Sequence, residues 1–376
     1  MVNQNILVAD ENFSQLNEYF SQREGKIFLL VHGKSMNKLR IGKFFDEVQN
    51  RYNVKIIHFT DYHPNPDYES IEKGIDIWNS EKCNEIVAVG GGSAIDVAKC
   101  IKLFANMNPN ENYLTQNIPP SDIQFLAIPT TAGSGSEATQ FAVVYYEGNK
   151  YSVDNESALP NAVFFDSYSL QNLPEYQKKS TLLDALCHAI ESSWSLKATI
   201  ESQIYASEAI KLIFANKDLF VKKSPDIQCC AYMLYAAHLA GKSINISRTT
   251  AGHAMSYKLT SLYNLAHGHA AALCVARIWP YMISLSQDDD NLAKIFKNIA
   301  YAMNCKTVED ASMKFRNIII DWNLNKTLRL ENDEHFNDEV VLLANSVNVQ
   351  RLSNNPIKIS EDDMKMLYRK ILTGSF

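Results

Sequence analysis

Three of the nine histidines of this 376-residue chain lie between residues 251 and 274, in a stretch of otherwise apolar or small side chains. They are His253, His267 and His269. Far upstream, Asp184 and His188 are four residues apart in a predicted helix, so their side chains share one helix face. Asp184 together with His188, His253 and His267 would supply one carboxylate and three imidazoles, a nitrogen–oxygen donor set suited to Fe²⁺ or Zn²⁺. Taken alone, the spacing of Asp184 and His188 favours a hydrogen bond along a helix face over a shared metal.

Two glycine-rich turns in the first half predict a site for an anionic ligand. The apolar run at 85–90 leads into Gly90-Gly91-Gly92-Ser93 and then a helical pattern, with Ser93 as a candidate cap for that helix. Glycines let a backbone approach a phosphate, and the free N–H groups at a helix start favour an anion. A second polar loop at 128–139 follows another predicted strand and contains Thr130, Thr131, Ser134, Ser136 and Thr139. Either turn alone could lack a ligand, whereas the pair favours a dinucleotide.

The predicted strand at 26–32 ends in His32-Gly33-Lys34-Ser35, where many NAD-binding strands end in an acidic residue that holds the ribose 2′-hydroxyl. Without that carboxylate a 2′-phosphate is not repelled, and Lys34 could pair with it. This favours NADPH over NADH. A loop lysine that is merely solvated is the alternative interpretation.

Alternating elements in the first half must position these turns. Short runs rich in Ile, Val and Phe predict strands at 26–32, 54–59, 85–90, 124–130 and 161–166, and helical patterns lie between them at 69–82 and 93–106. This alternation predicts a Rossmann-like α/β domain with a mostly parallel sheet.

From residue 175 onward the pattern is helical, with almost no strand signal. Asn172-Leu173-Pro174 is the natural boundary, because the residue before a proline resists helix and proline suits a helix start. We therefore expect an α/β dinucleotide-binding domain at 1–174 and an all-α metal-binding domain at 175–376. A cleft between two such domains is the expected place for an active site.

Composition excludes several classes of protein. Apolar residues make up 46% of the chain and charged residues 21%, which is typical of a globular protein. A net charge of −6 gives no broad electrostatic footprint for nucleic acid. No apolar run reaches the roughly 18 residues that a membrane span needs. The seven cysteines are odd in number and form no C-x-x-C pair, which indicates free thiols in a reducing cytoplasm.

Several motifs occur together in a characteristic order: PNP at 64–66, GGGSAIDVAK at 90–99, PTTAGSGSEAT at 129–139, and Asp-x3-His, Gly-His and Asn-x2-His-Gly at 184–188, 252–253 and 264–268. With these motifs the chain resembles the iron-containing (group III) alcohol dehydrogenases, relatives of glycerol dehydrogenase and dehydroquinate synthase, over nearly its whole length. The resemblance implies their two-domain fold and a homodimer or larger assembly.

The resemblance also implies roles for individual residues. The implied metal ligands are Asp184, His188, His253 and His267. The positions that match those around the dinucleotide are Gly91, Gly92, Ser93, Asp96, Thr130, Ser134, Thr139 and Lys150. Residues and resemblance together indicate hydride transfer between a nicotinamide and a carbonyl carbon, with the metal as a Lewis acid on the carbonyl oxygen.

The chain departs from the family pattern at two places. Many relatives carry a further histidine four residues after the position of His253, where this chain has Tyr257. If that histidine relays a proton, Tyr257, His269 or ordered water must replace it here. His269 could also line the substrate pocket, or it could be a helix histidine bonded to a nearby carbonyl.

The second departure from the family pattern is a pair of basic residues. Arg248 and Lys258 flank His253, and a guanidinium suits a phosphonate or carboxylate tail, whereas a neutral alcohol needs no cation near the metal. The stretch resembles the phosphonate-biosynthesis branch of the family, which reduces phosphonoacetaldehyde to 2-hydroxyethylphosphonate. The alternative is that both cations pair with acidic neighbours on helix faces.

Other activities are compatible with the motifs. A general alcohol or aldehyde reductase and a zinc-dependent polyol dehydrogenase are the nearest alternatives. A dehydroquinate-synthase-like lyase normally has a Glu, His, His metal set, which this chain does not match. A non-catalytic nucleotide or metal sensor is disfavoured, because such a relative would usually have lost part of a motif.

Overall fold

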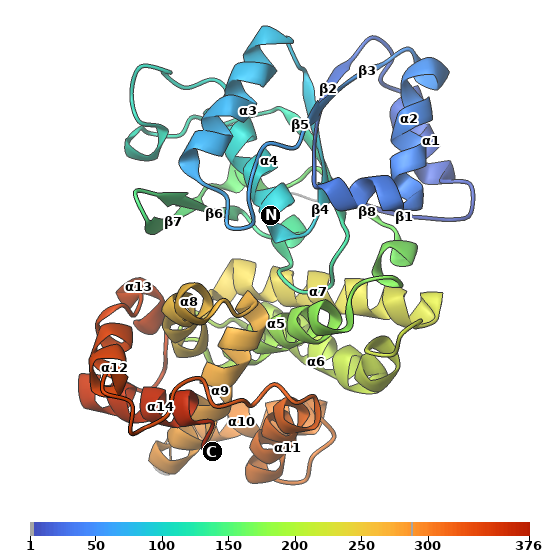
Figure 1. Cartoon of the computed structure of the whole chain (residues 1–376). Helices are drawn as coiled ribbons and strands as arrows, with labels where there is room; N and C mark the ends of the chain where they lie inside the picture. Colours follow the sequence, from blue (N-terminus) through green and yellow to red (C-terminus); the bar gives the residue numbers. More distant parts are fainter. Residues whose placement is uncertain (1–3, 287–288) are drawn as a thin grey trace. The chain divides into compact units, whose positions relative to one another are not determined.

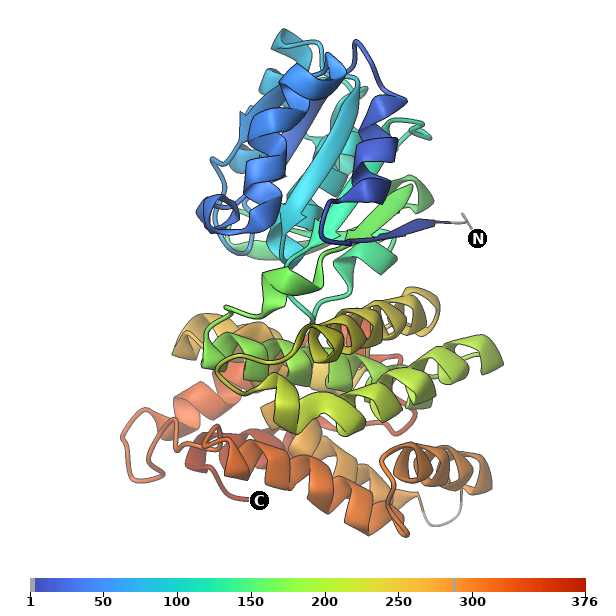
Figure 2. The same ribbon diagram turned by 90° about the vertical axis from the view of Figure 1, so that its right-hand side faces the viewer.

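The computed structural model describes residues 4–286 and 289–376 and divides the chain into two compact units. Unit 1 comprises Met1–Leu173 with Lys223–Leu234, and unit 2 comprises Pro174–Lys222 with Tyr235–Phe376. Figures 1 and 2 show the elements of each unit.

Unit 1 is built on a parallel sheet of six strands in the order β1-β8-β5-β4-β2-β3. The strands are β1 (Asn5–Val8), β2 (Ile27–His32), β3 (Lys55–Phe59), β4 (Glu85–Gly90), β5 (Gln124–Pro129) and β8 (Ala162–Phe165). The predicted parallel α/β sheet is thus confirmed, and β1 is an additional edge strand.

Helices cover both faces of this sheet. Helices α3 (Tyr68–Ser80) and α4 (Gly92–Phe104) pack on one face, and α1 (Ser14–Ser21) and α2 (Arg40–Tyr52) on the other (Figure 1). Successive residues of β2 serve opposite layers, since Leu29 and Val31 lie in the α3–α4 core and Phe28 and Leu30 in the α1–α2 core. Because both of their faces are buried, the inner strands β2, β4, β5 and β8 are largely apolar runs, whereas the edge strands β1 and β3 are partly exposed.

A two-stranded antiparallel hairpin, β6 (Phe141–Tyr146) with β7 (Asn149–Asp154), lies outside the main sheet. Its tight turn places Glu147 and Gly148 in the left-handed region, with φ of 49° and 76°. Five short 3₁₀ helices complete the regular structure described for unit 1, and only η1 (Lys34–Lys38) and η3 (Ser136–Ala138) bear on the sites.

All the regular secondary structure described in the second half of the chain is helical, which confirms the expected all-α architecture. Its helices are α5 (Glu175–Trp194), α6 (Ile200–Phe220), α7 (Ile227–Ser247), α8 (Ala251–Tyr263), α9 (His267–Leu285), α10 (Asp290–Ala302), α11 (Val308–Asp321), α12 (Phe336–Asn345), α13 (Val349–Leu352) and α14 (Glu361–Thr373). The first residues of α7 group with unit 1 and the rest with unit 2.

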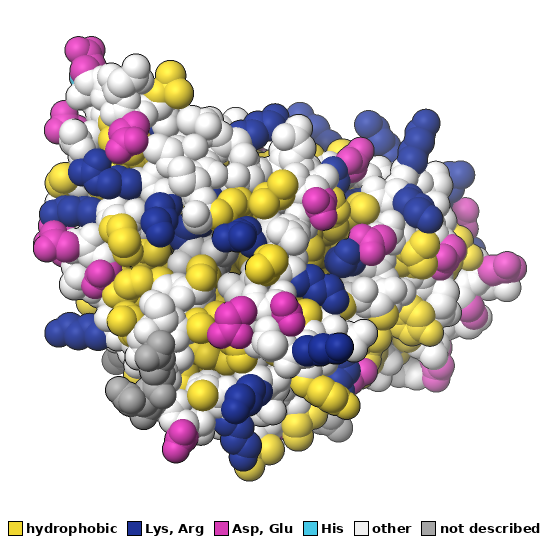
Figure 3. Space-filling model, turned by 90° about the horizontal axis from the view of Figure 1, so that it is seen from below, with side chains coloured by type: hydrophobic (Ala, Val, Ile, Leu, Met, Phe, Trp, Pro, Cys, Tyr) yellow, Lys and Arg dark blue, Asp and Glu magenta, His cyan; other side chains and the backbone are white. Residues whose placement is uncertain are grey.

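None of the helices in the described ranges combines the length and the apolar character that crossing a bilayer requires. On the face seen in Figure 3, basic and acidic side chains are interspersed with apolar ones and form no single-sign field.

Candidate metal and dinucleotide sites

Helix α5 carries the first two candidate metal ligands. Pro174 stands at its N-cap and an ion pair between Lys179 and Glu175 closes its first turn. Asp184 and His188 follow on one face of its buried middle, only 6% and 5% exposed. The distance between Asp184 Oδ1 and His188 Nε2 is 3.9 Å.

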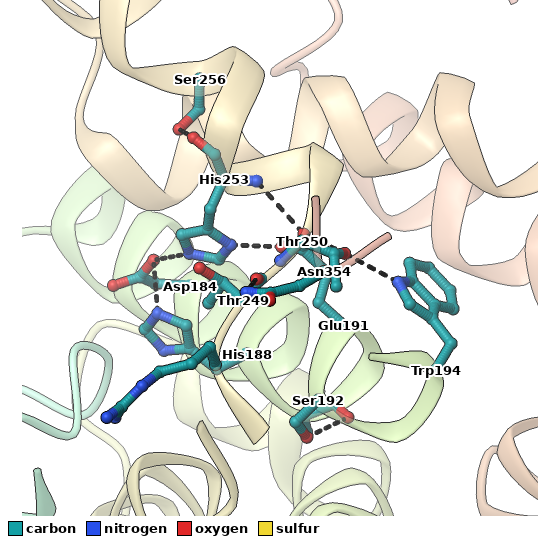
Figure 4. Close-up of polar contacts among 12 residues, drawn as sticks. Asp184, His188, Glu191, Ser192, Trp194, Thr249, Thr250, His253, Ser256 and Asn354 are labelled. Atoms are coloured by element: carbon teal, nitrogen blue, oxygen red, sulfur yellow. Dashed lines mark hydrogen bonds and ion pairs between the residues drawn. The ribbon is translucent and has the colours of Figure 1, made fainter. Parts of the chain in front are cut away.

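Helix α8 brings His253 to the same place, as Figure 4 shows. Its Nε2 lies 3.5 Å from Asp184 Oδ1, and its ring stacks on that of His188 with centroids 4.5 Å apart. Each of the three residues offers a ligand atom within 4.8 Å of the others, and all three are buried. The structure thus joins residues that are 65 positions apart in sequence.

His267, the fourth implied ligand, is the first residue of α9. Its ring centroid lies 5.3 Å from that of His253, so it borders the cluster without belonging to the three residues with close ligand atoms. Gly268 explains how α9 approaches so closely: a Cβ there would meet Ser180 O at 2.1 Å and Asp184 Cβ at 2.5 Å. The start of α9 therefore packs directly on α5.

The donor chemistry of the cluster fits a divalent metal ion. Among the described residues, Asp184 Oδ1 and His253 Nε2 are buried atoms with no hydrogen-bond partner, although they face each other. Burial raises the pKa of Asp184, but the imidazoles of His188, His253 and His267 outweigh it and hold that pKa below its usual range. Buried polar atoms that lack a partner are uncommon, and a cation between an ionised carboxylate and imidazoles would satisfy them.

Sequence reasoning missed Glu191, which lies two helical turns after Asp184 and is fully buried. Its carboxylate contacts Nδ1 of His253 at very short range. The available signal was its position: Asp184, His188 and Glu191 are related by i, i+4 and i+7, and so share one face of α5.

His269 is the third residue of α9, and both of its ring nitrogens have protein partners. Nε2 is 2.8 Å from Leu324 O and Nδ1 is 3.0 Å from the Tyr176 hydroxyl. Burial lowers the pKa of His269. These contacts agree with one of the alternatives that the sequence left open for His269, a helix histidine bonded to a nearby carbonyl. Tyr257, by contrast, stacks on His267 with ring centroids 5.8 Å apart.

Arg248 occupies the turn between α7 and α8 with a left-handed backbone, φ 65°. Buried hydrogen bonds hold this turn: Ser195 Oγ donates to Ser247 O, and Asn354 Nδ2 donates to Thr249 O. The side chain of Arg248 is half-buried, and its Nη1 donates to Asn245 O. Lys258, the second basic residue, is also half-buried, on α8.

In unit 1, the two glycine-rich turns lie against each other. Thr130 N donates to Gly90 O, and a Cβ at Gly92 would meet Ser134 Oγ at 2.9 Å. A Cβ at Gly91 would similarly meet the Thr131 hydroxyl at 3.1 Å. The turns thus form one surface at the carboxyl ends of β4 and β5, at the start of α4.

Ser93 does not cap α4, contrary to the prediction from the sequence. Gly91 is the N-cap of α4 and makes no side-chain cap, while Ser93 accepts a hydrogen bond from Asn65 N at 3.4 Å. A glycine N-cap leaves the first N–H groups of α4 without a side-chain acceptor, which is the condition for anion binding there.

Asp96 and Thr139 lie beneath these turns in a polar network. Asp96 accepts hydrogen bonds from Ser136 Oγ at 2.5 Å and Val143 N at 3.1 Å. Lys99, absent from the predicted site, is fully buried and donates to Ser136 Oγ, Thr139 Oγ1 and Phe141 O. The network ties α4 to the second turn and to β6.

At the end of β2, Gly33 precedes η1, whose first residue Lys34 is exposed. His32 is buried and lies 2.9 Å from Nδ1 of His58, so a histidine pair occupies the ends of β2 and β3. Lys150 is half-buried at the start of β7.

A parallel α/β unit with clustered glycine-rich turns and a helical unit with a buried Asp–His cluster define a dinucleotide-linked oxidoreductase. Models of two domains match the chain, "Iron-containing alcohol dehydrogenase" over residues 3–167 and "Fe-containing alcohol dehydrogenase family, C-terminal" over 178–372. The chain belongs to the iron-containing alcohol dehydrogenase family. It is therefore an oxidoreductase of the NAD(P)-dependent alcohol dehydrogenase class.

Characterised relatives differ in how much of their length the chain spans. The NADPH-dependent butanol dehydrogenase of Clostridium saccharobutylicum is 28% identical, with 95% of each chain covered. The phosphonoacetaldehyde reductase of Streptomyces viridochromogenes is 32% identical over 52% of each chain. The aldehyde-alcohol dehydrogenase 2 of Entamoeba histolytica is 31% identical over 69% of this chain, which spans only 31% of that protein.

Among solved structures, sulfoacetaldehyde reductase from Bifidobacterium kashiwanohense in complex with NAD⁺ has a TM-score of 0.86 and 22% identity, with 99% of this chain and 98% of that chain covered. At this identity the likeness concerns the fold alone.

Proposed function

We propose that the chain reduces an anionic aldehyde with NADPH, and that its substrate is phosphonoacetaldehyde, which becomes 2-hydroxyethylphosphonate. The observation that carries this proposal is Arg248, a half-buried guanidinium on a turn held by buried hydrogen bonds, five residues before His253. A guanidinium in such a turn is pre-organised for two oxygens of a phosphonate. The similarity to the Streptomyces reductase supports the same substrate class.

Asp184, His188, His253 and His267 are the proposed ligands of one Fe²⁺, or of Zn²⁺, which accepts the same donor set. When bound, such an ion supplies Lewis-acid chemistry to a carbonyl. The reaction adds one hydride, from the reduced dinucleotide, and one proton to the carbonyl group. Arg248 and Lys258 are proposed to hold the anionic tail and so fix the position of the carbonyl carbon.

Tyr257 and His269 are the proposed sources of the proton. The stacking of Tyr257 on His267 favours the tyrosine, because it places the tyrosine ring beside a proposed metal ligand. The donor need only sit within hydrogen-bond reach of the carbonyl oxygen, directly or through one water.

NADPH is proposed over NADH on the chemistry at the end of β2. Described groups there include Lys34 and the pair His32 and His58, and none of His32, Gly33, Lys34 and Ser35 is acidic. The proposed dinucleotide contacts are those named from the sequence: Gly33, Lys34, Gly91, Gly92, Ser93, Asp96, Thr130, Thr131, Ser134, Thr139 and Lys150. A homodimer or larger assembly in the cytoplasm, without nucleic-acid or membrane partners, is proposed with it.

The test compares kcat/KM for phosphonoacetaldehyde, butanal and lactaldehyde with NADPH and with NADH. We expect phosphonoacetaldehyde with NADPH to exceed the other pairs by at least tenfold. Arg248→Ala should raise KM for phosphonoacetaldehyde far more than for butanal, whereas Lys242→Ala, a half-buried cation on α7 that lies over the Tyr205 ring, should change neither. Equal efficiency across the aldehydes would contradict the substrate proposal.

A general alcohol or aldehyde reductase is the second candidate. The match to the Clostridium butanol dehydrogenase over 95% of both chains favours it. Faster reduction of butanal than of phosphonoacetaldehyde, with no effect of Arg248→Ala, would establish this alternative.

A further inference from the structure

Glu191 is a buried carboxylate that the chemistry of the proposed metal site does not itself explain. It lies on α5 with 0% exposure. Burying an ionised carboxylate is costly unless several hydrogen bonds satisfy it. The described residues supply four hydrogen bonds to the Glu191 carboxylate.

All four bonds come from the start of α8 (Figure 4). Oε1 accepts from Thr250 N at 3.0 Å, Thr250 Oγ1 at 2.7 Å and His253 N at 3.3 Å. Oε2 faces His253 Nδ1. The carboxylate therefore acts as the N-terminal cap of α8, and its last oxygen is left for one imidazole.

Two neighbours lock this arrangement. Trp194 Nε1 donates to Thr250 Oγ1 at 2.8 Å, so the threonine hydroxyl directs its own proton to Glu191. Gly252 leaves the space that the carboxylate occupies, because a Cβ there would lie 3.0 Å from Glu191 Oε2 and 2.4 Å from Val275 Cγ2. Glu191 is thus fixed in position before any ligand binds.

The position of Glu191 determines which nitrogen of His253 carries a proton. An ionised carboxylate only accepts hydrogen bonds, so Nδ1 of His253 must be the N–H. Its Nε2, which faces Asp184 Oδ1, then keeps its lone pair when the ring is neutral.

We propose that Glu191 is a positioning residue for metal binding: it orients His253 and holds the tautomer whose Nε2 lone pair binds the metal. The inference rests on the proposed metal site. Carboxylates that accept the second N–H of a metal-binding histidine typically contribute 10- to 100-fold in metal affinity.

The test measures Zn²⁺ affinity of the full chain by competition with a chromophoric chelator. Glu191→Gln keeps the shape of the side chain but presents an amide, and we expect it to weaken Zn²⁺ binding by 10- to 100-fold. Ser192→Ala is the matched control, because Ser192 is the next residue of α5, equally buried, and bonds to Ala189 O and Ser243 instead. An affinity of Glu191→Gln within threefold of wild type overturns the proposal.

A second measurement uses the unaltered chain, in case Glu191→Gln does not fold. In zinc-loaded protein labelled with ¹⁵N-histidine, His253 should show a protonated Nδ1 and a zinc-bound Nε2. The opposite tautomer overturns the role of Glu191.

A third variant separates this inference from the metal site itself. His188→Ala should abolish tight Zn²⁺ binding; if it does not, the proposed metal site fails. If His188→Ala abolishes binding and Glu191→Gln leaves it unchanged, only the role of Glu191 fails.

Discussion

At the scale of single residues, the proposed metal site depends on a glycine, Gly268, which has no side chain to hold α9 away from α5. Gly268 follows His267, and the lack of a Cβ lets the first turn of α9 touch the backbone of α5 at Ser180 and Asp184. A chain with any other residue there must hold α9, and His267 with it, farther from Asp184. The glycine thus belongs to the site although it has no chemistry of its own.

Replacing this glycine should therefore disturb both stability and metal binding. Gly268→Ala places a Cβ 2.1 Å from Ser180 O, a backbone atom that cannot swing away. We expect a loss of about 1–3 kcal/mol in the free energy of unfolding by urea, typical of overpacking, together with weaker Zn²⁺ binding. Gly33→Ala is the control, since its φ of −89° suits alanine and its nearest atoms lie at 3.8 Å. Equal stability of the two variants would contradict this prediction.

Lys99 provides a residue-scale prediction about pH. Burial, opposed in part by the charge of Asp96, lowers the pKa of Lys99 to about 8 in the folded chain, from 10.5. Between these values the unfolded chain binds the extra proton, so this group makes stability rise with pH, by about 1.4 kcal/mol per pH unit. The free energy of unfolding of wild type minus that of Lys99→Met should therefore become more positive from pH 8 to pH 10. A constant difference would show that Lys99 keeps its proton.

The sequence was sufficient to propose the histidines and Asp184, because their residue types signal metal chemistry and Asp184 with His188 has helical spacing. It was not sufficient for Glu191 or Lys99. Their hydrogen-bond partners at Thr250, His253 and Thr139 lie 40 or more positions away. Only the tertiary fold brings the start of α8 to α5, and β6 to α4, and so joins these groups. Nothing in the local pattern distinguishes such a buried charge from one on a solvated helix face.

At the scale of elements, the start of α9 is held by a clamp of hydrogen bonds. The Tyr176 hydroxyl accepts from Ala266 N at 3.1 Å and lies 3.0 Å from His269 Nδ1. Because Leu324 O can only accept, His269 Nε2 is the N–H, and Nδ1 accepts the tyrosine proton. The series of hydrogen bonds from Tyr176 through His269 to Leu324 thus joins α5, α9 and the segment after α11.

This clamp leads to opposite expectations for the two proposed proton donors. His269→Gln should reduce kcat by less than tenfold and lower the Tm, because the ring serves the clamp. Tyr257→Phe should reduce kcat by about 100-fold or more, the scale of general acid catalysis, with little change in Tm. Tyr176→Phe is the control for the clamp and should lower the Tm as His269→Gln does. A 100-fold loss of kcat in His269→Gln alone would make His269 the proton donor.

The elements of unit 1 show what periodicity can and cannot predict. The five strands expected from apolar runs are all present. Four of them lie inside the sheet, where strands buried on both faces must be apolar along most of their length. Strand β1 was missed because it is an edge strand in which only Leu7 of the four residues is buried, so the pattern of a strand buried on both faces does not apply to it. The β6–β7 hairpin was missed although Glu147-Gly148 is a turn signal, because only one flanking strand is apolar: β6 reads FAVVYY and β7 reads NKYSVD.

At the scale of the whole molecule, the proposed sites for the metal ion and for the dinucleotide belong to different units. The proposed metal ligands lie wholly in unit 2, on α5, α8 and α9, whereas the glycine-rich turns lie wholly in unit 1. Each ligand therefore stabilises the unit that binds it, by an amount that its own affinity and concentration determine. Helix α7 is the exception to this separation, because its residues divide between the units.

Separate binding predicts separate protection from hydrogen exchange. Zn²⁺ at 100 times its Kd stabilises the folded state over the unfolded state by about 2.7 kcal/mol, and we expect it to slow amide exchange in α5, α8 and the start of α9. NADPH should instead slow exchange at 90–99 and 130–139. His188→Ala is the control: it should remove the protection by Zn²⁺ and leave that by NADPH intact. Slower exchange at 90–139 with Zn²⁺ alone, and none at 184–194, would contradict the placement of the metal on α5, because a ligand protects first the backbone that its own contacts hold in place.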